Sequence, residues 1–200
     1  PNEQHWLGLC QDLHLLPAGS QVIIVTLASA QITCAINKLK NDMPQLQWLN
    51  IKSKQGRAIQ LNQGAARASH DFIWFLHADS QITAHNIHSL QACLANKNSE
   101  NSLFYFDLYF FDKSSWRLKI NEVGAKFRSN VLGLPFGDQG FFLSKATFTR
   151  LGGYSENAPY GEDHLLVWQA KHRGVKLRRC SSPLATSARK YQLQGWRALT

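Results

Sequence analysis

The segment from Gly56 to Ser80 constrains the fold of this chain more than any other part of the sequence. It opens with a glycine and Arg57 at the start of a helical pattern, and it continues into residues 72–76 (FIWFL), which are all apolar or aromatic. A short apolar run of this kind is typical of a strand that is buried on both faces of an α/β sheet. The segment therefore predicts a helix followed by a buried strand, and Asp79 lies just beyond the carboxyl end of that strand.

Both ends of this helix and strand unit carry candidate binding groups. Unpaired N–H groups give a helix N-terminus a partial positive charge, so Gly56 and Arg57 form a candidate phosphate seat. Ligands of open α/β sheets bind beyond the carboxyl ends of the strands, where Asp79 could hold a divalent cation. The alternative is that Asp79 or Ser80 only caps a following helix, which apolar spacing predicts over residues 82–94.

The rest of the chain alternates between predicted strands and helices. Strands are predicted at residues 22–27, 46–51, 103–111 and 141–143, and helices at residues 2–16, 32–39 and 116–127, with a short helix ended by Gly152 and Gly153. This alternation predicts an α/β fold with a mostly parallel central sheet, helices on both faces and a small antiparallel part. No repeat, low-complexity tract or linker divides residues 1–200, so we expect a single domain.

Composition excludes several other classes of protein. A chain of 200 residues that is 44% hydrophobic has enough apolar side chains for one sizeable core. No apolar run approaches the roughly 18 residues that a membrane span needs, and the first residues lack the pattern of a signal peptide. The four cysteines are far apart and form no CxxC pair, so neither zinc nor a redox dithiol is expected. We therefore expect a cytoplasmic protein.

Positive charge is concentrated at the C-terminal end. The chain has 22 basic and 13 acidic residues, a net charge of +9, and no acid follows Asp163. Such a region attracts a diphosphate, a polyanion or the anionic inner face of a membrane. The alternative is a solvated basic face with no single partner. No nucleic-acid-binding module is readable, so nucleic acid is not expected. The eight basic residues are Lys171, Arg173, Lys176, Arg178, Arg179, Arg189, Lys190 and Arg197.

Four ordered motifs resemble one known family. They are GRAIQLNQGA followed by FLHAD, then PFGDQGFFLSKATFTRLGGY at residues 135–154, YGEDHLLVWQAKHRG at residues 160–174, and LATSARKY at residues 184–191. Together they resemble a branch of the glycosyltransferase family 2-like proteins, which have the GT-A fold. The resemblance implies a metal-dependent, hexosyltransferase-like enzyme that transfers a sugar from a nucleotide-sugar donor, with inversion, to a saccharide or lipid-linked acceptor hydroxyl.

The resemblance also implies roles for individual residues on the donor side. Asp79 corresponds to the residue that holds the divalent cation (Mn or Mg) and the donor diphosphate, and His77 takes the place of the first acid of a DXD motif. Arg57 and Asn62 are candidate donor contacts, as is Gly56 at the helix start. Histidine is a softer ligand than a carboxylate, which distinguishes this motif from the usual pair of acids.

On the acceptor side, Asp163 of the Glu162-Asp163 pair corresponds to the catalytic base, which takes the proton of the acceptor hydroxyl. From the residues alone, both acids also suit the first turn of an ordinary helix. Asp138 and Gln139 either contact the sugar or acceptor or simply form a tight turn. The last candidates are Arg189 and Lys190, which could bind the donor diphosphate from a second side.

Two departures from the family pattern carry predictions of their own. Thr26 and Gln31 stand where family members have acids that contact the donor, and threonine supplies no carboxylate. This favours an alternative function, a catalytically weak or non-catalytic GT-A-like module that binds a nucleotide, a phosphorylated ligand or a partner protein. The second departure is at the N-terminus, where Pro1-Asn2-Glu3 resembles the end of the family's first strand. We therefore expect that strand upstream of Pro1.

Overall fold

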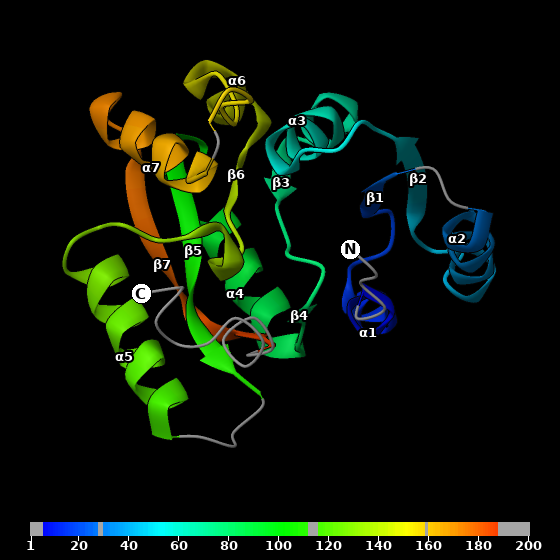
Figure 1. The fold of residues 1–200 in the computed structure, drawn as a ribbon, viewed down its shortest axis with the longest axis horizontal. Helices are drawn as coiled ribbons and strands as arrows, with labels where there is room; N and C mark the ends of the chain where they lie inside the picture. The colour runs from blue at the N-terminus through cyan, green and yellow to red at the C-terminus, as the bar shows by residue number, and fades with distance from the viewer. Residues whose placement is uncertain (1–5, 28–29, 112–115, 159, 188–200) are drawn as a thin grey trace.

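The computed structural model describes residues 6–27, 30–111, 116–158 and 160–187. The helices are α1 (Trp6–Asp12), α2 (Ala30–Asp42), α3 (Arg57–Arg67), α4 (Ala84–Leu94), α5 (Trp116–Asn130), α6 (Lys145–Leu151) and α7 (Glu162–His172). The strands are β1 (Gln21–Thr26), β2 (Gln47–Lys52), β3 (Phe72–Trp74), β4 (Ser80–Gln81), β5 (Ser102–Phe110), β6 (Phe142–Ser144) and β7 (Lys176–Thr186). Figure 1 shows their arrangement.

The strands form two sheets. β1 and β2 pair in parallel, and the other five strands have the order β3-β6-β5-β7-β4. In this second sheet β5 and β7 are parallel, whereas β6 runs antiparallel to β3 and β5, and β4 runs antiparallel to β7. The predicted α/β class is confirmed, and the sheets combine parallel with antiparallel pairs, with a larger antiparallel part than the sequence predicted.

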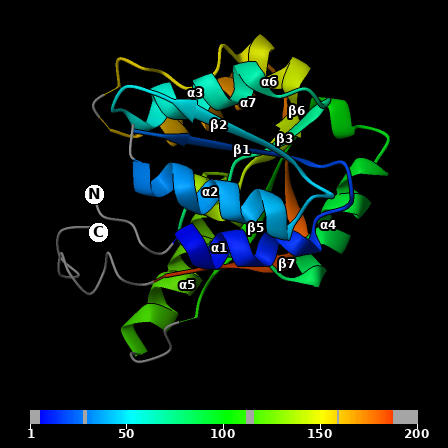
Figure 2. The ribbon, with the colours of Figure 1, turned by 90° about the vertical axis from the view of Figure 1, so that its right-hand side faces the viewer.

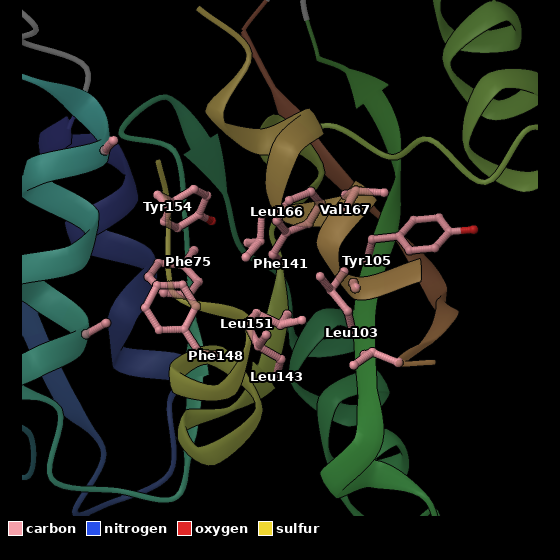
Figure 3. Close-up of a cluster of buried hydrophobic side chains, with 14 residues drawn as sticks. Phe75, Leu103, Tyr105, Phe141, Leu143, Phe148, Leu151, Tyr154, Leu166 and Val167 are labelled. Atoms are coloured by element: carbon pink, nitrogen blue, oxygen red, sulfur yellow. The ribbon is translucent and has the colours of Figure 1, made fainter. Parts of the chain in front are cut away.

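The largest apolar core lies between β5, β6 and the helices α3, α6 and α7 (Figure 3). Its centre is fully buried at Leu103, Phe141, Leu151 and Leu166. Phe75, which follows β3, joins this core through ring contacts with Phe148 and Tyr154, at centroid distances of 5.0 and 5.3 Å. This packing fixes the end of β3 against the helices that carry the candidate site residues.

The helices around β1 are divided between its two faces. Residues of α1 and α2 share a core with Val22 and Ile24 of β1. α3 packs on the opposite face so closely that a Cβ on Gly64 would lie 3.3 Å from Val25 Cγ2. Figure 2 shows α1 and α2 on one side of β1 and β2, with α3 on the other.

The structure corrects some predicted elements. The first predicted helix ends as α1 at Asp12, whose Oδ2 accepts a hydrogen bond from the backbone N–H of Ile82, and a 3₁₀ turn at Leu13–Leu15 follows. Strand β7 was not predicted, since its sequence contains arginines and Pro183. Pro183 pairs with Asp107 just after a register shift in β5, where the sheet tolerates a residue without an N–H.

Among the described residues, no helix combines the length and the hydrophobicity that crossing a bilayer requires.

Candidate functional site

The first turns of α3 and α7 meet at an ion-paired cluster. Arg57, the first residue of α3, donates from Nη1 to Asp163 Oδ2 at 2.8 Å and also to Glu162 Oε1. The Arg57 side chain is 37% exposed, whereas those of Glu162 and Asp163 are 15% and 16% exposed. α7 begins after Gly161, so both acids lie in the first turn as predicted, where the helix dipole stabilises negative charge. Residues 105 positions apart thus form one cluster.

The cluster shifts the ionisation of its members. Burial alone lowers the pKa of Arg57, but the charge of Asp163 and the hydrogen bonds to both acids outweigh burial and raise it. For the acid Glu162, burial acts in the opposite direction and raises the pKa. The hydrogen bond from Arg57 and the charge of Arg57 outweigh burial and lower the pKa of Glu162 below its ordinary value of 4.5. Arg57 therefore stays charged, and Glu162 stays ionised near neutral pH.

Glu162 should consequently make stability depend on pH. Its folded-state pKa is lowered, so the stabilisation is complete above the ordinary value of 4.5 and is lost as pH falls through the folded-state pKa. We expect Glu162→Gln to lower Tm at pH 7 and to leave a smaller difference from the unmodified protein at pH 3. Thermal unfolding at both pH values measures this. A difference that grows toward pH 3 would contradict the assigned ion pair.

Gly137 lies directly against this cluster. A Cβ on Gly137 would lie 2.4 Å from Asp163 Oδ1 and 2.5 Å from Arg57 Nη2, closer than any side chain can approach. Asp163 Oδ1 is buried and has no hydrogen-bond partner among the described residues. A buried acceptor without a partner lowers the stability of the fold, so such atoms often serve a function. Asp163 Oδ1 retains the capacity to accept a proton or a hydrogen bond.

The Gly137→Ala variant should therefore displace the cluster. We expect activity to fall about 10- to 100-fold, because small misplacements of reacting groups have effects of this size. Gly124→Ala in α5 is a matched control, since nothing lies within 4 Å of a Cβ built there. Steady-state rates of the two variants, with circular dichroism to check folding, test this. Full activity in Gly137→Ala would show that the close contact is not needed.

A second cluster follows β3 at its carboxyl end. His77 Nδ1 lies 2.5 Å from Asp79 Oδ1, and Thr186 of β7 donates to the same oxygen at 3.3 Å. Asp79 is held in place because the next residue, Ser80 of β4, pairs with Thr186. The capping alternative for Asp79 and Ser80 is wrong, because α4 begins only after Thr83 and Thr83 itself forms the capping contacts with Asn86.

One groove connects the two clusters. It has a volume of about 1690 Å³, and its lining includes Thr26, Gly56, Arg57, His77 and Gly137. Asp163 contacts Arg57 and packs against Gly137, and Asp79 contacts His77. The groove therefore brings the end of β1, the start of α3 and the end of β3 to one place, as expected for the ligand edge of an α/β sheet. Gly56, at the N-cap of α3, has φ 141°, which favours glycine.

Two predicted ligand contacts, Asn62 and Gln139, form hydrogen bonds within the protein. Asn62 bonds through its amide to the backbone N–H and C=O of Tyr154, both at 2.9 Å, and so holds the loop after α6. Gln139 is fully buried, and its amide contacts Ser129, Phe136 and Phe106. For Gln139 these contacts favour the alternative of a tight turn, here a 3₁₀ turn at Gly137–Gln139.

The remaining predicted site residues are Asp138, Arg189 and Lys190. Asp138 lies in the 3₁₀ turn beside Gly137. Arg189 and Lys190 lie outside the described residues. Within the described part of the basic region, Arg178 and Arg179 contact Ser102 and Asp107, and Lys171 and Arg173 contact backbone carbonyls. These four basic side chains therefore have partners within the protein and do not need a ligand.

The sequence of residues 22–152 matches the profile described as Glycosyl transferase family 2, which is well over half of the chain. The chain belongs to glycosyltransferase family 2.

Solved structures of glycosyltransferases share the GT-A-like fold of this family 2 chain. S. aureus TarS 1-349 superposes with a TM-score of 0.71 at 14% identity, over 92% of this chain and 57% of TarS. The mannosyltransferase PcManGT from Pyrobaculum calidifontis, in complex with GDP-Man and Mn²⁺, superposes with a TM-score of 0.70 at 13% identity, over 98% of this chain and 57% of that enzyme. TarS has also been solved with UDP. This chain thus spans little more than half the length of either neighbour, and no curated protein sequence matches it.

In this family 2 chain, the metal-ligating side chains His77 and Asp79 fit a cation that takes most of its ligands from elsewhere. The described residues contain no group of three or more His, Cys, Asp or Glu side chains that could hold a metal ion. One carboxylate, Asp79, lies against one imidazole, His77. Magnesium and similar ions often bind through one or two protein groups plus substrate phosphates. The His77-Asp79 pair fits an ion bound in this way, but it does not form a complete cage of protein ligands.

Sequence interpretation missed two residues of this site. Tyr154 lines the groove, and burial, followed by the charge of Asp163, raises its pKa well above the ordinary value of 10.0, so the phenol stays protonated. Thr186 contacts Asp79 from a strand that was not predicted. Neither residue has a local signal, because each joins the site through contacts with distant parts of the chain.

Proposed function

We propose that this family 2 protein transfers a sugar from a nucleotide-sugar donor to an acceptor hydroxyl with inversion. The observation that carries the proposal is the groove itself, whose lining residues contact the Glu162-Asp163 pair at one place and the His77-Asp79 pair at another. Such a reaction needs neutralisation of the leaving diphosphate and a base for the acceptor proton. The two clusters supply groups for these two tasks.

Asp163 is the proposed base. As the acceptor oxygen attacks the anomeric carbon from the face opposite the diphosphate, the carboxylate takes the hydroxyl proton and the bond to the diphosphate breaks. Arg57 holds Oδ2, and Gly137 encloses Oδ1. The carboxylate therefore reaches an acceptor after it rotates or after the turn at Gly137 shifts. Glu162 shares Arg57 and positions the pair.

Asp79 and His77 would hold a divalent cation, Mn²⁺ or Mg²⁺, against the donor diphosphate. When bound, such a cation neutralises the charge that develops on the leaving group. The N-terminus of α3, where Gly56 lines the groove, offers its backbone N–H groups to the phosphates, while Arg57 shares its charge with Glu162 and Asp163. The PcManGT complex with GDP-Man and Mn²⁺ supports this arrangement. Arg189 and Lys190 are proposed as a further grip on the diphosphate, and Asp138 as a sugar or acceptor contact.

Thr26 supports the second candidate function, a binding module without turnover. It lies at the end of β1 and lines the groove, where its hydroxyl, rather than a carboxylate, would meet the donor. This observation favours a module that binds a nucleotide or phosphorylated ligand without turnover.

Turnover separates the two functions. Full-length protein is incubated with a panel of nucleotide sugars, with and without Mn²⁺, and released nucleoside diphosphate is measured alongside calorimetric binding. Tight, Mn²⁺-dependent donor binding with hydrolysis or transfer is the result that the transferase predicts. Binding without release of diphosphate from any donor, or no binding to any donor in the panel, would contradict the transferase and favour the module.

We also propose peripheral contact with an anionic membrane, which would suit a lipid-linked acceptor. Its support is the outer face of α5, where Ile120, Val123 and Phe127 are spaced as one helical stripe and are about half or more exposed. Lys119 and Lys126 are direct sequence neighbours of this stripe. Sedimentation with anionic and neutral vesicles tests this. Binding to anionic vesicles that Val123→Asp abolishes is expected, and equal recovery with both vesicle types would contradict it.

A further inference from the structure

The fold brings two of the four cysteines into contact. The Sγ atoms of Cys93 and Cys180 lie 3.5 Å apart in a hydrogen bond between thiols, although 87 positions separate the two residues in sequence. Both residues are buried in an apolar cluster that also contains Phe104 and Leu184. The sequence has no CxxC pair and so predicts no redox dithiol, which means that this pair arises only from the tertiary fold.

Neighbouring contacts fix the spacing of the two elements that carry the pair. Cys93 lies in the last turn of α4, and Cys180 lies in β7. Asn86 and Ser89 lie on the same face of α4 as Cys93, because residues three and seven positions apart share one helix face. Asn86 Nδ2 and Ser89 Oγ both donate to Ser182 Oγ of β7, at 3.0 and 2.9 Å. The thiol pair thus continues a row of contacts that holds α4 against β7.

The two thiols differ in how readily they ionise. The hydrogen bond with Cys180 lowers the pKa of Cys93, and the charge of Arg178 acts in the same direction against the effect of burial. The same hydrogen bond, together with burial, raises the pKa of Cys180. Cys93 is therefore the thiol that supplies a thiolate, which is the reactive form of the side chain. By contrast, burial raises the pKa of Cys10 to about 12, so that thiol stays protonated.

We propose that Cys93 and Cys180 form an oxidation site, at which hydrogen peroxide converts the two thiols into a reversible disulfide that links α4 to β7. The Cys93 thiolate attacks one peroxide oxygen, and the O–O bond breaks. A sulfenic acid forms on Cys93, while the other oxygen leaves as hydroxide and takes up the proton that the Cys93 thiol has lost. The Cys180 sulfur then forms the S–S bond and displaces the sulfenic hydroxyl, which leaves as water with the Cys180 proton. The thiols lose two electrons and two protons, and the peroxide becomes two waters.

The disulfide can form with small movements. A disulfide holds its sulfur atoms about 2.0 Å apart, so the two sulfurs need to approach by only about 1.5 Å. Access for the oxidant comes from the end of α4, because Cys93 is followed by Leu94, the exposed last residue of this helix. Helix ends open locally more readily than helix centres, which lets a molecule as small as hydrogen peroxide reach Cys93. Thiol reductants reverse the reaction, so the bond belongs to oxidising conditions.

The cross-link would fix the elements that surround Asp79. Ser80, the next residue, belongs to β4, which pairs with the end of β7 and precedes α4. Thr186 of β7 also donates to Asp79 Oδ1. A cross-link that spans 87 positions strongly restricts the unfolded chain, so the oxidised protein should be the more stable form. The proposal does not depend on sugar transfer, because it rests on the thiol pair alone.

Thiol titration with peptide mapping tests the proposal in Cys34→Ser, which lacks the exposed thiol of α2. Hydrogen peroxide added to this folded variant should remove the thiols of Cys93 and Cys180 and link their peptides, and dithiothreitol should restore both thiols. Oxidation should also raise Tm by about 5–10 °C. Adding Cys180→Ala to this variant should abolish the linked peptides and the rise in Tm. Adding Cys10→Ala, which removes another buried thiol, should leave both effects in place.

Several results would overturn the proposal. Both thiols could remain titratable after peroxide treatment, the linked peptides could appear only after denaturation, or Cys93 could be oxidised to a sulfinic acid without a link to Cys180. A cross-linked protein with an unchanged or lower Tm would contradict the stabilising link between α4 and β7. Should Cys180→Ala fail to fold, the mapped peptides and the Tm of Cys34→Ser decide on their own.

Discussion

The Asp163→Asn variant is expected to transfer sugar about 10³-fold more slowly than the unmodified protein, with little change in donor affinity. Asparagine has nearly the same shape and still accepts a hydrogen bond from Arg57, but its amide does not take a proton at neutral pH. The effect should therefore fall on kcat. Initial rates at saturating donor, with calorimetric donor binding measured on the same samples, give the two quantities.

Asp42→Asn is the matched control for charge, because Asp42 is an exposed acid at the end of α2. It should keep full activity. Arg57→Lys is a useful companion variant, since lysine keeps the charge but cannot hold Glu162 and Asp163 with one planar group. Retained turnover in Asp163→Asn would remove Asp163 as the base, and loss of donor binding would give it a binding role instead.

The Asp79→Asn variant is expected to lose about 100-fold in kcat/KM and most of its response to Mn²⁺. The carboxylate is the only acid in the His77 cluster among the described residues, so its loss removes the negative charge that holds a cation beside the diphosphate. Rates measured across a Mn²⁺ titration test this. The effect should appear as weaker donor and metal binding rather than as a loss of the proton acceptor.

Asp12→Asn provides the comparison for Asp79. Asp12 also accepts a hydrogen bond across the fold, from the N–H of Ile82, but it does not line the groove. This variant should lower stability without changing the Mn²⁺ response. If Asp79→Asn and Asp12→Asn lose stability alike and both keep the Mn²⁺ response, Asp79 is a structural residue only.

Local patterns predicted the parts of the fold that depend on neighbouring residues. The apolar run of β3 and the glycine before Arg57 indicated a strand and a helix start, and both are present. The acids at the start of α7 were predicted for the same reason, since dipole and capping preferences act within one turn. The boundaries of β5 and α4 differ by one to two residues from the predicted ranges.

The contacts that build the site act over long distances in sequence and were not predicted. Arg57 pairs with acids more than 100 positions away, and Asp79 is held by Thr186 on the unpredicted β7. Asn62 and Gln139 have polar side chains that suit a ligand, yet Asn62 bonds to the backbone of Tyr154, and Gln139 bonds to the backbone of Phe106 in β5. Which polar groups a fold uses internally depends on its tertiary packing, and a single sequence does not contain that information.

We propose that one groove seats a donor diphosphate between the end of β1, the start of α3 and the end of β3. Paramagnetic broadening in NMR spectra of the full-length protein, with Mn²⁺ and either UDP or GDP, tests it most directly. We predict that the amide signals of Thr26, Arg57, His77 and Gly137 broaden only when metal and nucleotide are both present, while Gly124 in α5 stays sharp. Broadening centred elsewhere, or none with a nucleotide that binds, would contradict the account.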